Sequence, residues 1–202
     1  MAGMQGEALH AKGADGARRA KRWLESTTRV NAQWVNPNAA AIPKLEFSWP
    51  EGGRTFSFDL GGLFKYDEFD GQTFYAESKM YSDSSNLPGH YEEFLAKCYV
   101  AYLDRAMFCD HFMWISWSPH TASRWSTHTS EETVRAAVIA QRKRIFGDLD
   151  EATAEGLVDD AVVSEVASRL WLIILSERQE QLVITPGHRG LIEAYEAEKA
   201  SS

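Results

Sequence analysis

Glu77 and Lys79 are two charged residues in a segment that otherwise has the composition of a β-strand. Residues 74–81 read Phe-Tyr-Ala-Glu-Ser-Lys-Met-Tyr, and aromatic residues are typical of strands. Because successive side chains of a strand point to opposite faces, Glu77 and Lys79 share one face, with Cα atoms about 7 Å apart. The spacing therefore predicts a carboxylate and an ammonium group side by side.

A second carboxylate is expected beside this pair. Residues 55–60 alternate between apolar and polar side chains, and Asp59 lies on their polar face. Gly61-Gly62 can supply a bend, and an Asp-Gly sequence further on favours a hairpin turn. Folding about residues 68–71 places position 59 opposite about position 80. Asp59 would then be a diagonal cross-strand neighbour of both charged residues.

The chemistry that suits these three groups is metal-dependent. Two carboxylates held close together repel each other unless a cation lies between them. Mg²⁺ takes oxygen ligands, commonly one or two carboxylates together with a substrate phosphate. A neighbouring lysine can orient or deprotonate an attacking water, or offset charge that develops on the phosphate. The residues predict a site that cleaves phosphodiesters, and the alternative is a cross-strand ion pair on a solvated hairpin.

The arrangement resembles the PD-(D/E)xK nuclease superfamily, in which an acidic residue at a strand bend precedes a strand that carries Glu-x-Lys. Asp59 matches the first acid, Glu77 the second and Lys79 the lysine. The resemblance implies Mg²⁺-dependent cleavage of DNA by these three residues, with Mn²⁺ as an alternative ion. It also implies that Asp59, Glu77 and the carbonyl group of Ser78 bind the metal.

The resemblance also implies a fold. The superfamily has the order helix, three antiparallel strands, helix and strand, which can be followed over about residues 12–118. Amphipathic patterns predict helices over 12–28 and from 90 to about 105. Expected strands are 45–49, 55–60, 74–81 and, buried at the centre, 112–117. We therefore expect an α/β fold with a restriction-endonuclease-like core, a central mixed β-sheet flanked by helices.

The rest of the chain is expected to extend this core, so that residues 1–202 form a single domain. The extension, about 119–202, has the pattern helix, hairpin, helix. Its expected elements are a helix over 161–170, hairpin strands at 171–175 and 181–185, and a terminal helix over 187–199. We expect this part to determine the choice of substrate or partner.

The first helix is basic, although the whole chain has a formal net charge of −8. Residues 12–29 contain six basic and two acidic side chains. Arg18, Arg22 and Arg29 are the candidate contacts to DNA phosphates, with a solvated helix face as the alternative. In resolvase-type members of the resembled superfamily a glutamate of this helix helps to hold metal. The aligned residue here is Ala17.

Composition limits the remaining possibilities. A chain of 202 residues, 44% of them hydrophobic, can form one domain with a substantial core. No apolar run reaches the ~20 residues that span a bilayer, and residues 1–20 have no signal-peptide core, so we expect a cytoplasmic protein without membrane contact. Two cysteines indicate no disulfide framework. A zinc site built from Cys109, His111, His120 and His128 has no established ligand spacing.

Three interpretations stay open at this stage. The first is a Mg²⁺-dependent DNA endonuclease, which the resemblance associates with defence against phages and mobile elements or with recombination. The second is a catalytically inactive DNA-binding or scaffolding subunit of a larger complex, which Ala17 favours. The third is an unrelated α/β binding protein with a Glu-x-Lys surface salt bridge. Cleavage of both DNA strands would favour a homodimer.

Overall fold

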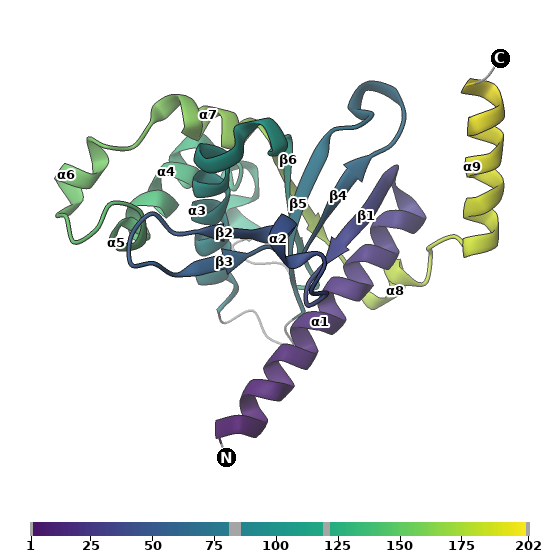
Figure 1. The fold of residues 1–202 in the computed structure, drawn as a ribbon, viewed down its shortest axis with the longest axis horizontal. Coiled ribbons are helices and arrows are strands. Elements are labelled where there is room, and N and C mark those ends of the chain that lie inside the picture. The colour runs from purple at the N-terminus through teal and green to yellow at the C-terminus, as the bar shows by residue number, and fades with distance from the viewer. Residues whose placement is uncertain (1, 81–85, 119–121, 201–202) are drawn as a thin grey trace.

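A five-stranded mixed β-sheet forms the centre of the molecule in the computed structural model, which describes residues 2–80, 86–118 and 122–200 (Figure 1). Its strand order is β1-β4-β5-β6-β7. The strands are β1 (Val30–Val35), β4 (Leu60–Phe64), β5 (Thr73–Lys79), β6 (His111–Ser116) and β7 (Leu170–Ile174). β4 pairs antiparallel with β1 and β5, and β6 pairs parallel with β5 and β7. The expected α/β fold with a mixed sheet flanked by helices is confirmed.

Long helices cover both faces of the sheet, and shorter elements connect them (Figure 1). The longer helices are α1 (Ala2–Thr27), α3 (Leu87–Arg105), α4 (Glu131–Ala140), α7 (Asp160–Ser168) and α9 (Pro186–Ala200). The short ones are α2 (Ile42–Leu45), α5 (Arg142–Ile145), α6 (Glu151–Glu155) and α8 (Glu177–Glu180). A separate two-stranded sheet pairs β2 (Glu46–Ser48) with β3 (Thr55–Ser57). No helix in the described part of the chain is long and apolar enough to cross a membrane.

The two faces of β5 belong to two different hydrophobic cores. Phe74 and Ala76 pack in a core that includes Leu24 of α1. Tyr75 packs in the other core, which includes Phe94 of α3. The alternation predicted for this strand is therefore correct. It directs Glu77 and Lys79 to the face that α3 covers.

The strand expected over 55–60 is broken in the structure. Phe58 belongs to the core beneath α3, whereas Leu60 belongs to the core beneath α1. Residues two apart in one regular strand would share a face, so the chain must turn between them. The bend lies at Asp59, after β3 and before β4.

The first strand of the main sheet was also predicted wrongly. Residues 46–48, within the strand expected over 45–49, form β2 and pair with β3 outside the main sheet. The third antiparallel strand is instead β1, which the sequence prediction missed although the first five residues of Val-Asn-Ala-Gln-Trp-Val alternate between apolar and polar side chains. The β1–β4 register shifts between Asn31 and Trp34. Gly62 allows this bulge, because a Cβ atom at that position would overlap the carbonyl oxygen of Asn31.

The expected C-terminal hairpin is not formed. β7 joins the sheet parallel to β6, and residues 181–185 adopt no strand. The continuous apolar sequence of β7, Leu-Trp-Leu-Ile-Ile, is typical of parallel strands. The terminal helix does form, as α9, which stands at one side of the molecule (Figure 1). Polar contacts hold it: Lys65 Nζ lies 3.2 Å from Glu193 Oε1, and Arg189 donates to the Thr28 carbonyl at 2.8 Å.

Candidate active site

Asp59 is fixed at the bend before β4 by backbone and side-chain hydrogen bonds. Its amide donates to the Ala76 carbonyl at 3.0 Å, and its carbonyl accepts from the Asn36 amide at 2.9 Å. Its carboxylate oxygen Oδ2 accepts from the Ser78 amide at 2.8 Å and the Ser78 hydroxyl at 3.1 Å. The first acid therefore lies against the Glu-Ser-Lys segment of β5.

The register of the β4–β5 hairpin brings Asp59 closer than the sequence predicted. Leu60 pairs with Ala76 and Leu63 with Thr73, so continuing the ladder places Asp59 opposite Glu77. The predicted partner was about position 80. The turn lies nearer to the amino terminus than expected, because the chain leaves β4 through a 3₁₀ turn at Asp67–Phe69.

Glu77 lies at the centre of a buried charge cluster. Its side chain is 5% exposed, and Lys79, at 18%, places Nζ 2.7 Å from Glu77 Oε1. Lys97 of α3, at 12%, places its own Nζ 3.3 Å from the same oxygen. The predicted Glu77–Lys79 pair is thus made, but it is not the solvated surface pair of the alternative interpretation.

The two carboxyl groups titrate in opposite directions. Burial and then the negative charge of Glu77 raise the pKa of Asp59 to about 6. Burial also acts to raise the pKa of Glu77, but Lys97 and Lys79 together outweigh it and the pKa is lowered. The site therefore holds one stably ionised carboxylate and one that gives up its proton near pH 6.

The residues fit one hard divalent cation. Glu77 Oε2 is buried and finds no hydrogen-bond partner among the residues that the structure describes, although buried polar atoms are usually paired. The repulsion between two neighbouring carboxylates is the kind that a divalent cation relieves. Within the described residues, no group of three or more His, Cys, Asp or Glu side chains could hold a metal. Asp59 and Glu77 are the two side chains that could supply carboxylate ligands here.

The three arginines predicted to contact DNA lie in different surroundings. α1 passes close to the site at Gly16, where an added Cβ atom would lie 3.3 Å from Ser78 Oγ. Arg18 and Arg22 are exposed on α1 within two turns of Gly16. Arg29 lies beyond the other end of α1 and pairs with Asp67. At a rise of about 1.5 Å per helical residue, it is roughly 20 Å along the helix from Gly16.

Lys97 is the functional candidate that the sequence prediction missed. Three residues before it and four after it on α3 are Phe94 and Ala101, both buried. Positions three and four apart share a helix face. A lysine within the apolar stripe of a helix was therefore the available signal.

The zinc interpretation finds no support. Cys109 Sγ donates to the Ala101 carbonyl at 3.5 Å, and His111 bonds to Gln72 at 2.7 Å and accepts from Trp171 at 3.1 Å. His120 lies outside the described residues. The other three proposed ligands form no metal-binding group in the described part of the chain.

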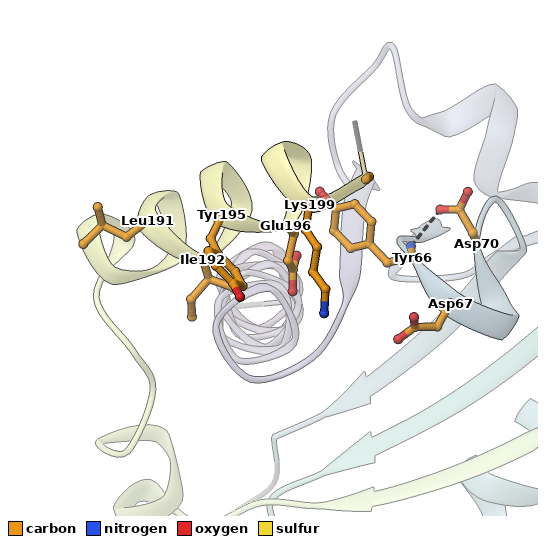
Figure 2. Close-up of a pocket in the computed structure, with 9 residues that line it drawn as sticks. Tyr66, Asp67, Asp70, Leu191, Ile192, Tyr195, Glu196 and Lys199 are labelled. Carbon is orange, nitrogen blue, oxygen red and sulfur yellow. Dashed lines mark hydrogen bonds between the residues drawn. The ribbon is translucent and has the colours of Figure 1, made fainter. Parts of the chain in front are cut away.

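A wide cleft of about 850 Å³ lies away from the charge cluster, between α9 and the β4–β5 turn (Figure 2). Figure 2 shows Tyr66 reaching from the turn toward the end of α9, where Lys199 lies. Leu191 and Tyr195 of α9 also line the cleft and are exposed. It contains none of the predicted catalytic residues.

Comparison with known proteins gives little further information. No protein-family model matches the sequence, and no curated protein matches it. Among solved structures, one similar chain is described as the Cap4 SAVED/CARF-domain containing receptor of Moraxella osloensis. The identity is 9% and the TM-score 0.39, over 83% of this chain and 34% of the receptor chain. The chain thus spans about a third of that receptor's length.

Proposed function

We propose that the chain is a Mg²⁺-dependent DNA endonuclease that hydrolyses phosphodiester bonds at Asp59, Glu77 and Lys79. The observation that carries this proposal is the buried convergence of two carboxylates and a lysine at the β4–β5 bend. Charged side chains are rarely buried in such a cluster unless they are paired or functional. The unpaired Glu77 Oε2 supports a cation there, and so does the repulsion between Glu77 and Asp59 that contributes to the raised pKa of Asp59.

The topology supports the same proposal. α1, the antiparallel strands β1, β4 and β5, helix α3 and the parallel strand β6 follow one another in the chain. This is the order of the resembled PD-(D/E)xK superfamily, with the β2–β3 hairpin inserted after the first strand. We therefore propose a restriction-endonuclease-like core, in which Asp59 lies at the strand bend and Glu77 and Lys79 lie on the next strand.

The chain's own residues account for metal binding and for orientation. Asp59, Glu77 and the Ser78 carbonyl are the proposed metal ligands. When bound, Mg²⁺ supplies Lewis-acid polarisation of the phosphate and a more acidic water. Lys79 pairs with an ionised carboxylate, so it is an ammonium group that donates hydrogen bonds. Its proposed role is to orient the water and offset charge on the phosphate.

The reaction is an in-line hydrolysis. A water oxygen bonds to phosphorus while the bond from phosphorus to the leaving ester oxygen breaks. One proton of the water passes through solvent to that oxygen. The products are a phosphate monoester and a hydroxyl group. Arg18 and Arg22 on α1 are the proposed contacts to flanking phosphates, since both are basic and exposed.

A cleavage panel tests the proposal. Purified protein is incubated with plasmid, linear, single-stranded and branched DNA in Mg²⁺ or Mn²⁺, beside Lys79→Ala and Asp59→Ala. We expect at least one DNA form to be cut and both variants to lose activity while remaining folded. Lys143→Ala is the matched control, because Lys143 is 72% exposed and pairs only with exposed Asp148 among the ion pairs described. Intact DNA in every condition, also with proteins encoded beside it, would contradict the proposal.

A catalytically inactive DNA-binding or scaffolding subunit is the second candidate. The absence of a third carboxylate around the site in the described residues favours it, as does Ala17, which is buried against the sheet. This candidate predicts DNA binding without cleavage by the wild-type protein. A role in defence or recombination stays a prediction from the resemblance.

A further inference from the structure

Lys97 is a second ammonium group on Glu77, and it comes from a different layer of the fold. Lys79 reaches the carboxylate from β5, whereas Lys97 reaches it from α3, with Nζ atoms 2.7 Å and 3.3 Å from the same oxygen. Both lysines are mostly buried. Two like charges against one buried carboxylate oxygen repel each other, so stability alone gives no reason for the second.

The surroundings of Lys97 fix its position. Its helix neighbours Phe94 and Ala101 are buried, and its Nζ lies 6.0 Å from the centre of the Phe56 ring. Such an aromatic contact favours a cation. Within the part of the chain that the structure describes, Lys97 forms its ion pair with Glu77. The ammonium group is therefore held in the site rather than at the surface.

Charge balance indicates what this cation does. The two carboxylates of Asp59 and Glu77 are offset by the two ammonium groups of Lys79 and Lys97, so the protein groups are neutral together. One divalent cation then gives the site two positive charges, which match the total of two negative charges that a phosphodiester carries while hydroxide attacks it. Two-metal sites supply such charge with a second ion. With Asp59 and Glu77 taken as ligands of the first ion, the described residues add no third His, Cys, Asp or Glu side chain to this group for a second ion.

We propose that Lys97 is a fixed cation that takes the place of a second metal, so that the site binds a single divalent ion. This inference rests on the proposed nuclease function. It assigns to Lys97 stabilisation of the charge on the phosphate, and to Glu77 a carboxylate shared between Lys97 and the metal. Lys97 and the metal compete for the Glu77 carboxylate. Loss of Lys97 is therefore expected to affect metal binding and cleavage in opposite directions.

Removal of the Lys97 charge should therefore have opposite effects on metal binding and on cleavage. Lys97→Gln removes a cation that competes for Glu77, so Mn²⁺ should bind about tenfold more tightly. The cleavage rate at saturating Mn²⁺ should fall about 100-fold, because the phosphate loses its second cation. A residue with only a structural role would weaken both when removed.

The test is a Mn²⁺ titration of the full chain at pH 7.5. The electron paramagnetic resonance signal of free Mn²⁺ monitors the titration, and cleavage is measured on the same samples. Wild type should bind one ion per chain. Lys97→Arg should keep wild-type affinity within about threefold and retain most of the cleavage rate, since it keeps the charge. Lys143→Gln is the matched surface control. If Lys97→Gln does not fold, Lys97→Met suits the apolar neighbours and takes its place.

Two results would overturn the inference: two Mn²⁺ ions per wild-type chain, or a neutral Lys97 variant with unchanged affinity and cleavage. Failure of the proposed function gives a different result. In that case wild type and Asp59→Asn would show the same weak Mn²⁺ binding, and wild type would cut no DNA.

Discussion

The charge cluster beneath α3 and the cleft beside α9 are opposite kinds of surface. The cluster is small and nearly buried: both lysines lie within 3.3 Å of Glu77 Oε1, and Asp59 accepts from the Ser78 amide. The cleft is wide and open, and its apolar residues Leu191 and Tyr195 are 71% and 66% exposed. Buried charges reduce stability unless they are compensated, whereas an exposed apolar side chain has little cost. The size of a cleft therefore does not identify the candidate active site of this molecule. The buried, compensated charges do.

The largest expected effect is a loss of stability when Glu77 of the charge cluster is replaced. Glu77→Gln leaves the ammonium groups of Lys79 and Lys97 buried without their shared carboxylate. Breaking a buried ion pair from one side costs about 3–5 kcal/mol, so we expect a loss of about 3 kcal/mol in the free energy of unfolding. Urea denaturation at pH 7.5 measures it.

Glu93→Gln is the matched control for this change. Glu93 lies on α3 and pairs with Arg144 at 2.8 Å, but both side chains are about one-third exposed or more. Exposed pairs contribute less than about 1 kcal/mol. Equal losses from both substitutions would mean that the cluster is an ordinary ion pair.

Asp59→Asn should have the opposite effect on stability. Asp59 is ionised at pH 7.5 although burial and Glu77 oppose its charge, so a neutral amide removes that repulsion. The amide oxygen can still accept from the Ser78 amide and hydroxyl. We expect the melting temperature of the metal-free protein to rise by roughly 2–6 °C. A fall, measured by calorimetry, would mean that Asp59 is held for stability rather than for chemistry.

The same variant gives a pH dependence. The folded-state pKa of Asp59 is about 6, above its ordinary 3.8, so between these values the folded chain binds more protons than the unfolded chain. The contribution of Asp59 to stability therefore decreases as pH rises through this window and is constant above it. The advantage of Asp59→Asn over wild type should be full above about pH 6 and vanish below pH 3.8. A difference that does not vary with pH would contradict the assigned pKa.

The smallest effects are expected at the cleft. Leu191→Ser and Tyr195→Ser change exposed residues of a helix that has no buried residue. We expect each to alter the free energy of unfolding by less than about 0.5 kcal/mol and to leave DNA cleavage unchanged. A loss of cleavage comparable to that of Lys79→Ala would show that substrate passes over α9, and the contrast between the two regions would fail.

The sequence predicted local patterns better than pairings between distant segments. Alternation in β5 assigned Glu77 and Lys79 to one face, and the amphipathic pattern identified the buried stripe of α3. The strand β1 did carry a local signal, because its first five residues alternate between apolar and polar side chains. No local pattern could reveal that it completes the sheet, because its partner β4 is 30 residues away. Likewise, Lys97 has a local signal as a lysine in an apolar stripe, but no local signal reports that α3 crosses over Glu77 and brings the two together.

The most direct test of the central claim is the rate at which supercoiled plasmid is nicked in Mg²⁺ by wild type and by Asp59→Asn, at equal concentrations of folded protein. The account predicts nicking by wild type that chelation of the metal stops, and a rate at least about 1,000-fold lower for Asp59→Asn. If Asp59→Asn nicks the plasmid as fast as wild type, the assignment of Asp59 as a metal-binding carboxylate is contradicted.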